Sequence, residues 1–263
     1  MPILSLKAGG HLHYEVHGSG PPLMVFNNLG GTATFWQPHV ASFAERFTVV
    51  LHDHRGAGRS SLDEIAFSVD QMVDDALALA DHLKIERFDV LGHSTGGAMG
   101  LTVAITRPER INRLLVSSSW PGPDPYFDLL FHARTLTIKH LGPEEYVRQT
   151  MLIGRPPQWL RDHPEDTAPP KPEVVKATIP SPACLIGRIA ALRAFDRRAD
   201  LHRVKCPTFL TCAVDDMVTP VHLTRELIAA IPHARSEILD WGGHFYPVIR
   251  PDILREQVLK FFA

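Results

Sequence analysis

The fold of this chain is decided by residues 88–97, FDVLGHSTGG. The first four residues have the apolar character of a buried strand, and residues 95–106 have the pattern of a helix that stops before Pro108. A Gly-x-Ser-x-Gly at such a strand-to-helix turn forms a nucleophile elbow, where strained backbone lifts the serine hydroxyl clear of the sheet. Gly92 and Gly96 leave the space that this turn needs. The stretch therefore predicts Ser94 as a nucleophile; the alternative is an ordinary glycine-rich turn.

Strand and helix patterns alternate on either side of this turn. Buried parallel strands appear as short apolar runs, and amphipathic helices show apolar residues every three or four positions. Ser68, with Gln71 three residues later, forms a capping box before one helix. The order predicts an α/β fold with a mostly parallel sheet and helices on both faces. Expected strands are 3–7, 12–16, 23–26, 48–51, 88–91, 113–116, 208–212 and 236–239; expected helices are 35–46, 69–83, 95–106, 220–231 and 253–262.

The alternation stops between residues 121 and 200. This stretch is rich in proline, and its apolar residues favour helices at 127–141, 144–153 and 186–195. We therefore predict a core domain from 1–120 and 201–263, with a helical cap, residues 121–200, inserted after the sixth strand. A disordered linker is the alternative, but Phe131, Trp159 and Phe195 argue for packing.

Composition excludes several classes of protein. The chain has 263 residues, 27 Lys and Arg and 29 Asp and Glu, hence a formal charge of −2 at pH 7. Such a balance argues against a nucleic-acid partner, which requires a basic face. No apolar run reaches the length of a membrane span, and residues 1–10 lack the features of a secretory signal. Three cysteines without a Cys-x-x-Cys pair favour a reducing compartment, so we expect a cytoplasmic protein without a membrane partner.

A serine nucleophile requires a base, and the base requires an orienting acid. Asp215 and Asp216 follow the strand at 208–212, and His244 follows the strand at 236–239 in the stretch WGGH. Parallel strands bring these ends to the edge of the sheet that carries Ser94. The chain order serine, acid, histidine is the one found on this type of sheet.

Together these motifs resemble the α/β-hydrolase superfamily along essentially the whole chain. The resemblance implies an eight-stranded, mostly parallel sheet with a cap, and no cofactor. In that family the acid commonly stands four residues before the proline of an Asp-x-x-(Val/Thr)-Pro stretch, which selects Asp216, before Pro220. Asp215 remains the alternative, with the expected role of a solvated or helix-capping acid.

The resemblance also implies an oxyanion hole of two backbone N–H groups. One belongs to Thr95, directly after the nucleophile. The other comes from the loop after the third strand, where the family usually has His-Gly-x. Alignment places Asn27 and Asn28 at His-Gly and makes Leu29 the second donor.

A narrower resemblance rests on residues 27–31 (NNLGG), 53–58 (DHRGAG), 159–161 (WLR), 193–196 (RAFD) and 241–244 (WGGH). These stretches are similar to the aminoacrylate/carbamate hydrolase of pyrimidine degradation and to the oxoadipate enol-lactonase. Some members of the first group carry alanine at the nucleophile position. This chain has Ser94, which favours covalent serine chemistry.

We therefore expect hydrolysis of a small-molecule ester, lactone or amide-like bond. Expected substrate contacts are Asn28, Trp120, Trp159 and Phe245, although core packing explains the two tryptophans equally well. Carbamate hydrolysis, carbon–carbon bond hydrolysis and cofactor-free perhydrolysis on the same triad are alternatives, and a ligand receptor without turnover is a further one. We expect no metal, because His11 with His13, and His52 with His54, lack a convincing third ligand. The sequence leaves monomer and homodimer open.

Overall fold

A computed structural model describes residues 2–7 and 9–262; Met1, Ala8 and Ala263, which belong to the expected core ranges, lie outside the described residues. Within these residues an eight-stranded sheet has the order β1-β2-β4-β3-β5-β6-β7-β8. The β1–β2 and β2–β4 pairs are antiparallel, and the other neighbouring pairs are parallel. The predicted mostly parallel sheet is confirmed. Its strands are β1 Ile3–Ser5, β2 His11–His17, β3 Pro22–Phe26, β4 Thr48–His52, β5 Phe88–His93, β6 Ile111–Ser117, β7 Thr208–Ala213 and β8 Arg235–Leu239.

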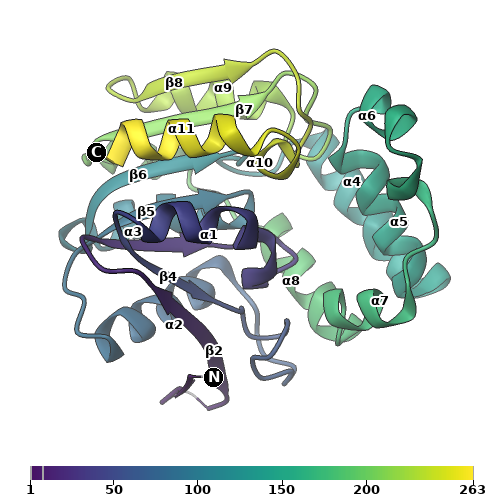
Figure 1. Cartoon of the computed structure of the whole chain (residues 1–263), viewed down its shortest axis with the longest axis horizontal. Coiled ribbons are helices and arrows are strands. Elements are labelled where there is room, and N and C mark those ends of the chain that lie inside the picture. The colour runs from purple at the N-terminus through teal and green to yellow at the C-terminus, as the bar shows by residue number, and fades with distance from the viewer. Residues whose placement is uncertain (1, 8, 263) are drawn as a thin grey trace.

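Helices cover both faces of this sheet (Figure 1). Helices α1 (Gln37–Ala44) and α11 (Pro251–Phe262) pack in one apolar cluster with the strands. Helices α2 (Val69–His82), α3 (Thr95–Thr106) and α9 (Val221–Ala230) pack in a second cluster, on the other face. Two buried apolar layers therefore hold the strands in place, which fixes the edge where strand-end side chains meet.

The start of α2 shows how local chemistry sets these boundaries. The predicted capping box is confirmed, because the Ser68 hydroxyl accepts a hydrogen bond from the Gln71 backbone N–H at 3.0 Å. This bond satisfies one of the N–H groups that lack an intrahelical partner at a helix start. Apolar residues of α2 then pack against α3, which is buried along almost its entire length. Helix α3 therefore lies firmly between α2 and the sheet, with Ser94 at its start.

The helices from the expected cap lie between β6 and β7 in the chain. They are α4 (Pro125–Leu136), α5 (Gly142–Gly154), α6 (Pro157–Asp162), α7 (Pro172–Thr178) and α8 (Pro182–Ala194). Figure 1 shows α4 to α7 as a layer to one side of the sheet, with α8 between that layer and the strands. The two ends of this insertion meet. The Arg197 N–H donates to the Pro121 carbonyl at 2.8 Å, and the Arg198 guanidinium donates to the Gly122 and Pro123 carbonyls.

Several boundaries differ from the sequence prediction. The expected helix at 127–141 is α4 followed by a π-helical turn, Thr137–Leu141. Helices α6 and α7, and the short α10 (Tyr246–Ile249), were not predicted, because each has one or two turns and a proline at its start. Helix α8 begins four residues early, where Ser181 accepts the Cys184 N–H. Proline fits the first turn of a helix, since the missing N–H would have no partner there.

Within the described residues, no single helix is both long and apolar enough to cross a bilayer. Helices α7 and α8 reach that length and composition only as a pair, bent by 47° where they join.

Candidate active site

Ser94 lies in strained backbone between the end of β5 and the start of α3. Its φ of 55° and ψ of −116° are rare for a residue with a side chain. A Cβ atom on Gly92 would collide with the Gly96 carbonyl, and one on Gly96 would collide with the Phe26 carbonyl. The crowding expected from the sequence is thus present, and both positions require glycine. Strain of this kind is found at the nucleophile of a strand-turn-helix elbow.

Backbone hydrogen bonds hold Ser94 in this conformation. Its N–H donates to the Ser117 carbonyl at 2.8 Å, and its carbonyl accepts from the Ser119 hydroxyl at 2.9 Å. Among the hydrogen bonds of the described residues, none uses the Thr95 N–H as donor. That group lies at the start of α3, where the helix dipole favours negative charge. The Ser94 turn therefore provides a free N–H donor beside a hydroxyl.

The Asp216 carboxylate and the His244 imidazole are both buried and lie in direct contact. The His244 Nδ1 lies 2.9 Å from Asp216 Oδ2 and 3.1 Å from Oδ1. The carboxylate also accepts from the Val218 N–H at 2.8 Å, the Thr219 N–H at 2.9 Å and the Thr219 hydroxyl at 3.0 Å. Because a carboxylate only accepts, this geometry assigns the proton to Nδ1 and leaves Nε2 free to take one.

The electrostatics favour a charged Asp216. Its burial alone would raise the pKa of the carboxyl, but nearby His244 and the N–H donors of Val218 and Thr219 act more strongly. The net pKa therefore lies below its ordinary value of 3.8. An ionised Asp216 can orient the imidazole and stabilise an imidazolium that forms during a reaction.

Asp215 has a different place from the one expected. It is half-buried, and it does not cap the helix that follows, α9, whose N-cap is Pro220. Its carboxylate accepts from the Gly243 N–H at 2.8 Å and from the Gly242 N–H at 3.3 Å. These glycines have positive φ angles of 141° and 62°, and they lead directly to His244. Asp215 therefore fixes the turn that positions His244.

Ring contacts join the Ser94 turn to the His244 loop. The His93 ring lies with its centroid 4.9 Å from that of His244 and stacks on Phe35 at 5.1 Å. Ser94 directly follows His93, so the structure brings Ser94, His244 and Asp216 to one edge of the sheet. Sequence reasoning placed all three at that edge.

The loop after β3 supplies the second expected N–H donor. Within it, Asn28 Oδ1 accepts from the Gly30 N–H, and the Asn28 carbonyl accepts from the Gly31 N–H, each at 2.9 Å. No hydrogen bond of the described residues uses the Leu29 N–H as donor. The Asn27 side chain fastens the loop to the His52 carbonyl on β4. The loop is therefore tightly built, and the roles of Leu29 and Thr95 in an oxyanion hole stay predictions.

The aromatic residues expected to contact substrate lie in distinct surroundings. Trp120 is fully buried, and its ring packs on Phe127 and Phe195. Trp159 stacks on a cap histidine and donates to Asp166 Oδ2 at 2.8 Å. Phe245 lies between core and cap, because its N–H donates to the Gly154 carbonyl and its ring faces His244. Contact with substrate stays a prediction for each of them and for Asn28, whose carbonyl Oδ1 is already engaged.

Three histidines are buried near the site. Burial lowers the pKa of His52 to about 4, although nearby Asp53 opposes the shift. Burial, with Arg188 and His52, holds the pKa of His54 well below its ordinary value of 6.5. Burial and the neighbouring His244 do the same to the pKa of His93. These imidazoles are therefore neutral in the folded protein at neutral pH.

This neutrality predicts loss of stability in mild acid. Unfolded histidine binds a proton below about pH 6.5, whereas folded His52 resists protonation down to about pH 4. The contribution of each such histidine to the free energy of unfolding is thus fully present above pH 6.5. Below pH 6.5 it falls by about 1.4 kcal/mol for each pH unit, down to the pKa of the folded state. Urea unfolding at pH 7 and pH 5 measures the loss, and His52→Gln should reduce it by about 2 kcal/mol. His132 is exposed, so the matched variant His132→Gln should lose as much stability in acid as the wild type does. An equal loss in the wild type, His52→Gln and His132→Gln would contradict the prediction.

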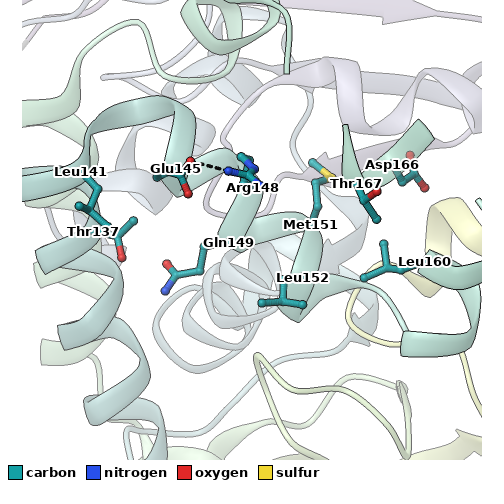
Figure 2. Close-up of a pocket in the computed structure, with 10 residues that line it drawn as sticks. All are labelled: Thr137, Leu141, Glu145, Arg148, Gln149, Met151, Leu152, Leu160, Asp166 and Thr167. Carbon is teal, nitrogen blue, oxygen red and sulfur yellow. Dashed lines mark hydrogen bonds and ion pairs between the residues drawn. The ribbon is translucent and has the colours of Figure 1, made fainter. Parts of the chain in front are cut away.

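A cap cavity of about 350 Å³ lies apart from these residues (Figure 2). Glu145 and Arg148, which line it, form an ion pair of 2.7 Å. Figure 2 shows this pair on one side of the cavity and Met151 and Leu160 on the other. None of the expected catalytic or substrate-contacting residues lines this cavity. In the described part of the chain, no group of three or more His, Cys, Asp or Glu side chains is arranged to hold a metal ion.

Sequence reasoning missed Arg188 on α8. Its guanidinium donates to the Leu29 carbonyl and lies 3.3 Å from His54 Nδ1, so it reaches the loop that carries an expected oxyanion donor. A signal was present, since Arg188 is the one charged residue in the apolar run 184–192, CLIGRIAAL. A lone charge within such an apolar run is unusual without a partner or a function.

Comparison with known proteins agrees with this architecture. Residues 21–249 match the family model described as alpha/beta hydrolase fold. The chain is 34% identical to a protein of Azorhizobium caulinodans with the provisional name carbamate hydrolase RutD, over 95% of this chain and 94% of that protein. It is 35% identical to a protein of the same name from Caulobacter sp. strain K31, over 96% of both chains.

A solved structure adds a likeness in fold. The crystal structure of the enol-lactonase from Burkholderia xenovorans LB400 superposes with a TM-score of 0.89 over 99% of both chains, at 24% identity. Both resemblances noted in the sequence are thus recovered. The chain belongs to the alpha/beta hydrolase fold family of enzymes.

Proposed function

We propose that the protein is a serine hydrolase that cleaves a small ester, lactone or amide-like bond through an acyl-enzyme on Ser94. The observation that carries the proposal is the buried Asp216–His244 pair, which lies at the same sheet edge as the strained Ser94 turn. A carboxylate on Nδ1 leaves Nε2 as the base that a serine hydroxyl needs. The Leu29 and Thr95 N–H groups, which have no acceptor among the described hydrogen bonds, support an oxyanion hole.

The steps follow from these roles. Ser94 Oγ attacks the substrate carbonyl carbon, and its proton passes to His244 Nε2. The carbonyl oxygen becomes an oxyanion, which accepts from the Leu29 and Thr95 N–H groups. When the carbonyl re-forms, the bond to the leaving group breaks, and His244 gives its proton to that group. Water then repeats the sequence on the acyl-enzyme, which releases a carboxylic acid and restores Ser94.

A second candidate is carbamate hydrolysis on the same residues. It is favoured by the two relatives named carbamate hydrolase, each more than 30% identical to the chain over almost its whole length. The bond broken would then be a carbon–nitrogen bond, with ammonia or an amine as leaving group. We take the substrate to be a small molecule, and we propose the cytoplasm as compartment, supported by the free thiols of Cys184, Cys206 and Cys212. Monomer and homodimer remain alternatives.

A fluorophosphonate probe tests the proposal. The probe should modify one residue, and mass spectrometry of the digested protein should place the adduct on Ser94, because only an activated serine attacks phosphorus rapidly. A short-chain 4-nitrophenyl ester should be hydrolysed by the untreated enzyme and not by the labelled one. A chelator should leave that rate unchanged. Folded protein that takes no label and turns over no ester would refute covalent serine catalysis and favour a ligand receptor.

A further inference from the structure

A row of polar side chains crosses the sheet beside the candidate active site. It occupies positions in lateral register on β5, β6, β7 and β8, namely His93, Ser117, Thr211 and Glu237. Residues in register on parallel strands point to the same face of a sheet. Two residues earlier, that face carries Leu91, Leu115 and Phe209, which pack in the apolar cluster with α11. Polar groups in such a layer cost free energy unless they are paired, so their partners are informative.

One continuous chain of hydrogen bonds joins this row to α10 and α11. His93 Nδ1 lies 3.0 Å from Ser117 Oγ, and Ser117 Oγ lies 2.9 Å from the Tyr246 hydroxyl oxygen. That hydroxyl lies 3.4 Å from Gln257 Oε1, and Gln257 Nε2 lies 3.0 Å from a carboxylate oxygen of Glu237. Glu237 is exposed, and the other four residues are buried. We call these five residues the Ser117 chain.

The exposed end of the Ser117 chain decides where its protons lie. The Glu237 carboxylate only accepts, so the Gln257 amide turns its NH₂ toward Glu237 and its oxygen toward Tyr246. Burial raises the pKa of the Tyr246 hydroxyl above its ordinary value, so the hydroxyl keeps its proton and donates it to that oxygen. The Tyr246 oxygen then accepts from the Ser117 hydroxyl. Because the Ser117 proton is used there, Ser117 Oγ accepts from the His93 Nδ1–H.

The tautomer of His93 is therefore fixed, with a proton on Nδ1 and none on Nε2. Nε2 has no hydrogen-bond partner among the described residues, so no contact at that end opposes this choice. Burial, with the neighbouring His244, holds the pKa of His93 well below its ordinary value, and the ring stays neutral. The His244 ring lies 4.9 Å away, centroid to centroid. An imidazolium that forms on His244 during the proposed reaction thus has a neutral neighbour instead of a second positive charge.

Ser117 also connects the two halves of the candidate active site. Its carbonyl accepts the Ser94 N–H at 2.8 Å, and its hydroxyl bonds to Tyr246, two residues after His244. The strained Ser94 turn and the His244 loop are thus both fastened to the last residue of β6. A displacement of about 1 Å between reacting groups can slow a reaction by about 100-fold, so this common attachment matters for catalysis.

We propose that the Ser117 chain positions His244 against Ser94. Ser117 and Tyr246 are positioning residues, because they fasten the loop that carries His244. His93 is a neutral neighbour of fixed tautomer that packs against the His244 ring. The inference rests on the proposed serine hydrolase function and goes beyond it, since these residues act through His244.

Tyr246→Phe tests the chain while the aromatic ring is retained. The Ser117 proton loses its acceptor, and we expect kcat for the 4-nitrophenyl ester to fall by about tenfold with KM within about twofold of wild type. The matched control is Tyr14→Phe on β2, because Tyr14 is also buried and its hydroxyl lies 3.2 Å from His82 Nε2. Both variants should show a similar decrease in Tm, but Tyr14→Phe should keep the wild-type kcat. A folded Tyr246→Phe enzyme with wild-type kcat would overturn the proposal.

A double variant shows whether the two hydroxyls act together. Ser117→Ala and Tyr246→Phe interrupt the same chain, so their effects on kcat should not multiply. We expect the double variant to have a kcat within about threefold of the slower single variant. Independent effects would instead multiply to a loss of about 100-fold, and that result would contradict a common positioning chain.

The tautomer of His93 can be measured without an activity assay. NMR spectra of enzyme labelled with ¹³C and ¹⁵N in histidine distinguish Nδ1–H from Nε2–H rings, and a His93→Phe variant assigns the signal. We expect the Nδ1–H form in the wild type from pH 6 to pH 8. In Tyr246→Phe the Ser117 proton can turn to His93 Nδ1, so the signal should shift toward the Nε2–H form. An Nε2–H ring in the wild type would overturn the proposal.

Failure of the proposed function has a different signature. If Ser94 takes no fluorophosphonate label, the serine hydrolase function fails, and the positioning role fails with it. If Ser94 is labelled and Tyr246→Phe keeps the wild-type kcat, only the positioning role is refuted.

Discussion

Ser94→Ala is expected to lower kcat/KM for a 4-nitrophenyl ester by at least about 10⁴-fold. The variant removes the attacking oxygen and keeps the Cβ atom that the strained turn already accommodates, so the fold should be retained. Fluorophosphonate labelling should disappear together with activity. Stopped-flow kinetics should also show that the initial burst of nitrophenol, which reports formation of an acyl-enzyme, is lost.

Controls make this result specific to Ser94. Ser236→Ala changes an exposed serine on β8, at the far edge of the sheet, and should retain wild-type activity. Thermal melting should show that both variants are folded. Ser94→Ala also separates two mechanisms, covalent attack by Ser94 and direct attack by water. Activity of Ser94→Ala within about tenfold of wild type would indicate that His244 activates water directly. The proposed acyl-enzyme mechanism would then be wrong.

Asp216→Asn is expected to lower kcat by about 10⁴-fold with little change in KM. An amide NH₂ can face His244 Nδ1 only when that nitrogen carries no proton, so the imidazole would adopt the other tautomer. Nε2 would then hold the proton and could not accept one from Ser94. The amide oxygen can still accept from the Val218 and Thr219 N–H groups, so the loop should keep its shape.

Asp215→Asn is the natural comparison, because the two acids are neighbours and both were candidates from the sequence. Asp215 holds the Gly242 and Gly243 N–H groups, and an asparagine oxygen can replace one of those acceptors. We expect a loss of about tenfold, as His244 shifts slightly. Measurements of kcat for both variants between pH 6 and 9 show which of the two acids orients His244. A larger loss for Asp215→Asn would show that the orienting acid has been misassigned.

The core of the fold could be predicted because its signals are local. Buried parallel strands leave continuous apolar runs, and each run is followed by the residues that meet at one sheet edge. Ser94, Asp216 and His244 were identified for that reason, since each lies in a loop directly after a strand. The contact between Asp216 and His244 is shown by the structure; their catalytic roles stay proposals.

The cap and its arginine could not be predicted in the same way. Helices α6 and α7 are too short to show a helical period, and their starting prolines are typical of loops as well as of helix starts. The role of Asp215 depends on two glycines that approach it from 27 and 28 residues away. Arg188 has no Asp or Glu partner among the described residues, and only the packed structure shows which carboxylates lie too far away to pair with it. Such contacts follow from three-dimensional packing, which the residue pattern does not encode locally.

The joined base of the cap has an evolutionary consequence. Because the Arg197 N–H and the Pro121 carbonyl close the insertion at its root, β6 and β7 are spaced as if a short connection joined them. The entropy of closing a longer loop grows only slowly with length. Changes in length at the outer surface of this segment, away from the Arg188 contact with Leu29 and the Gly154 contact with Phe245, should therefore leave β6 and β7 in place. The outer surface of the segment can thus vary between relatives while the strands that carry Ser94, Asp216 and His244 keep their register.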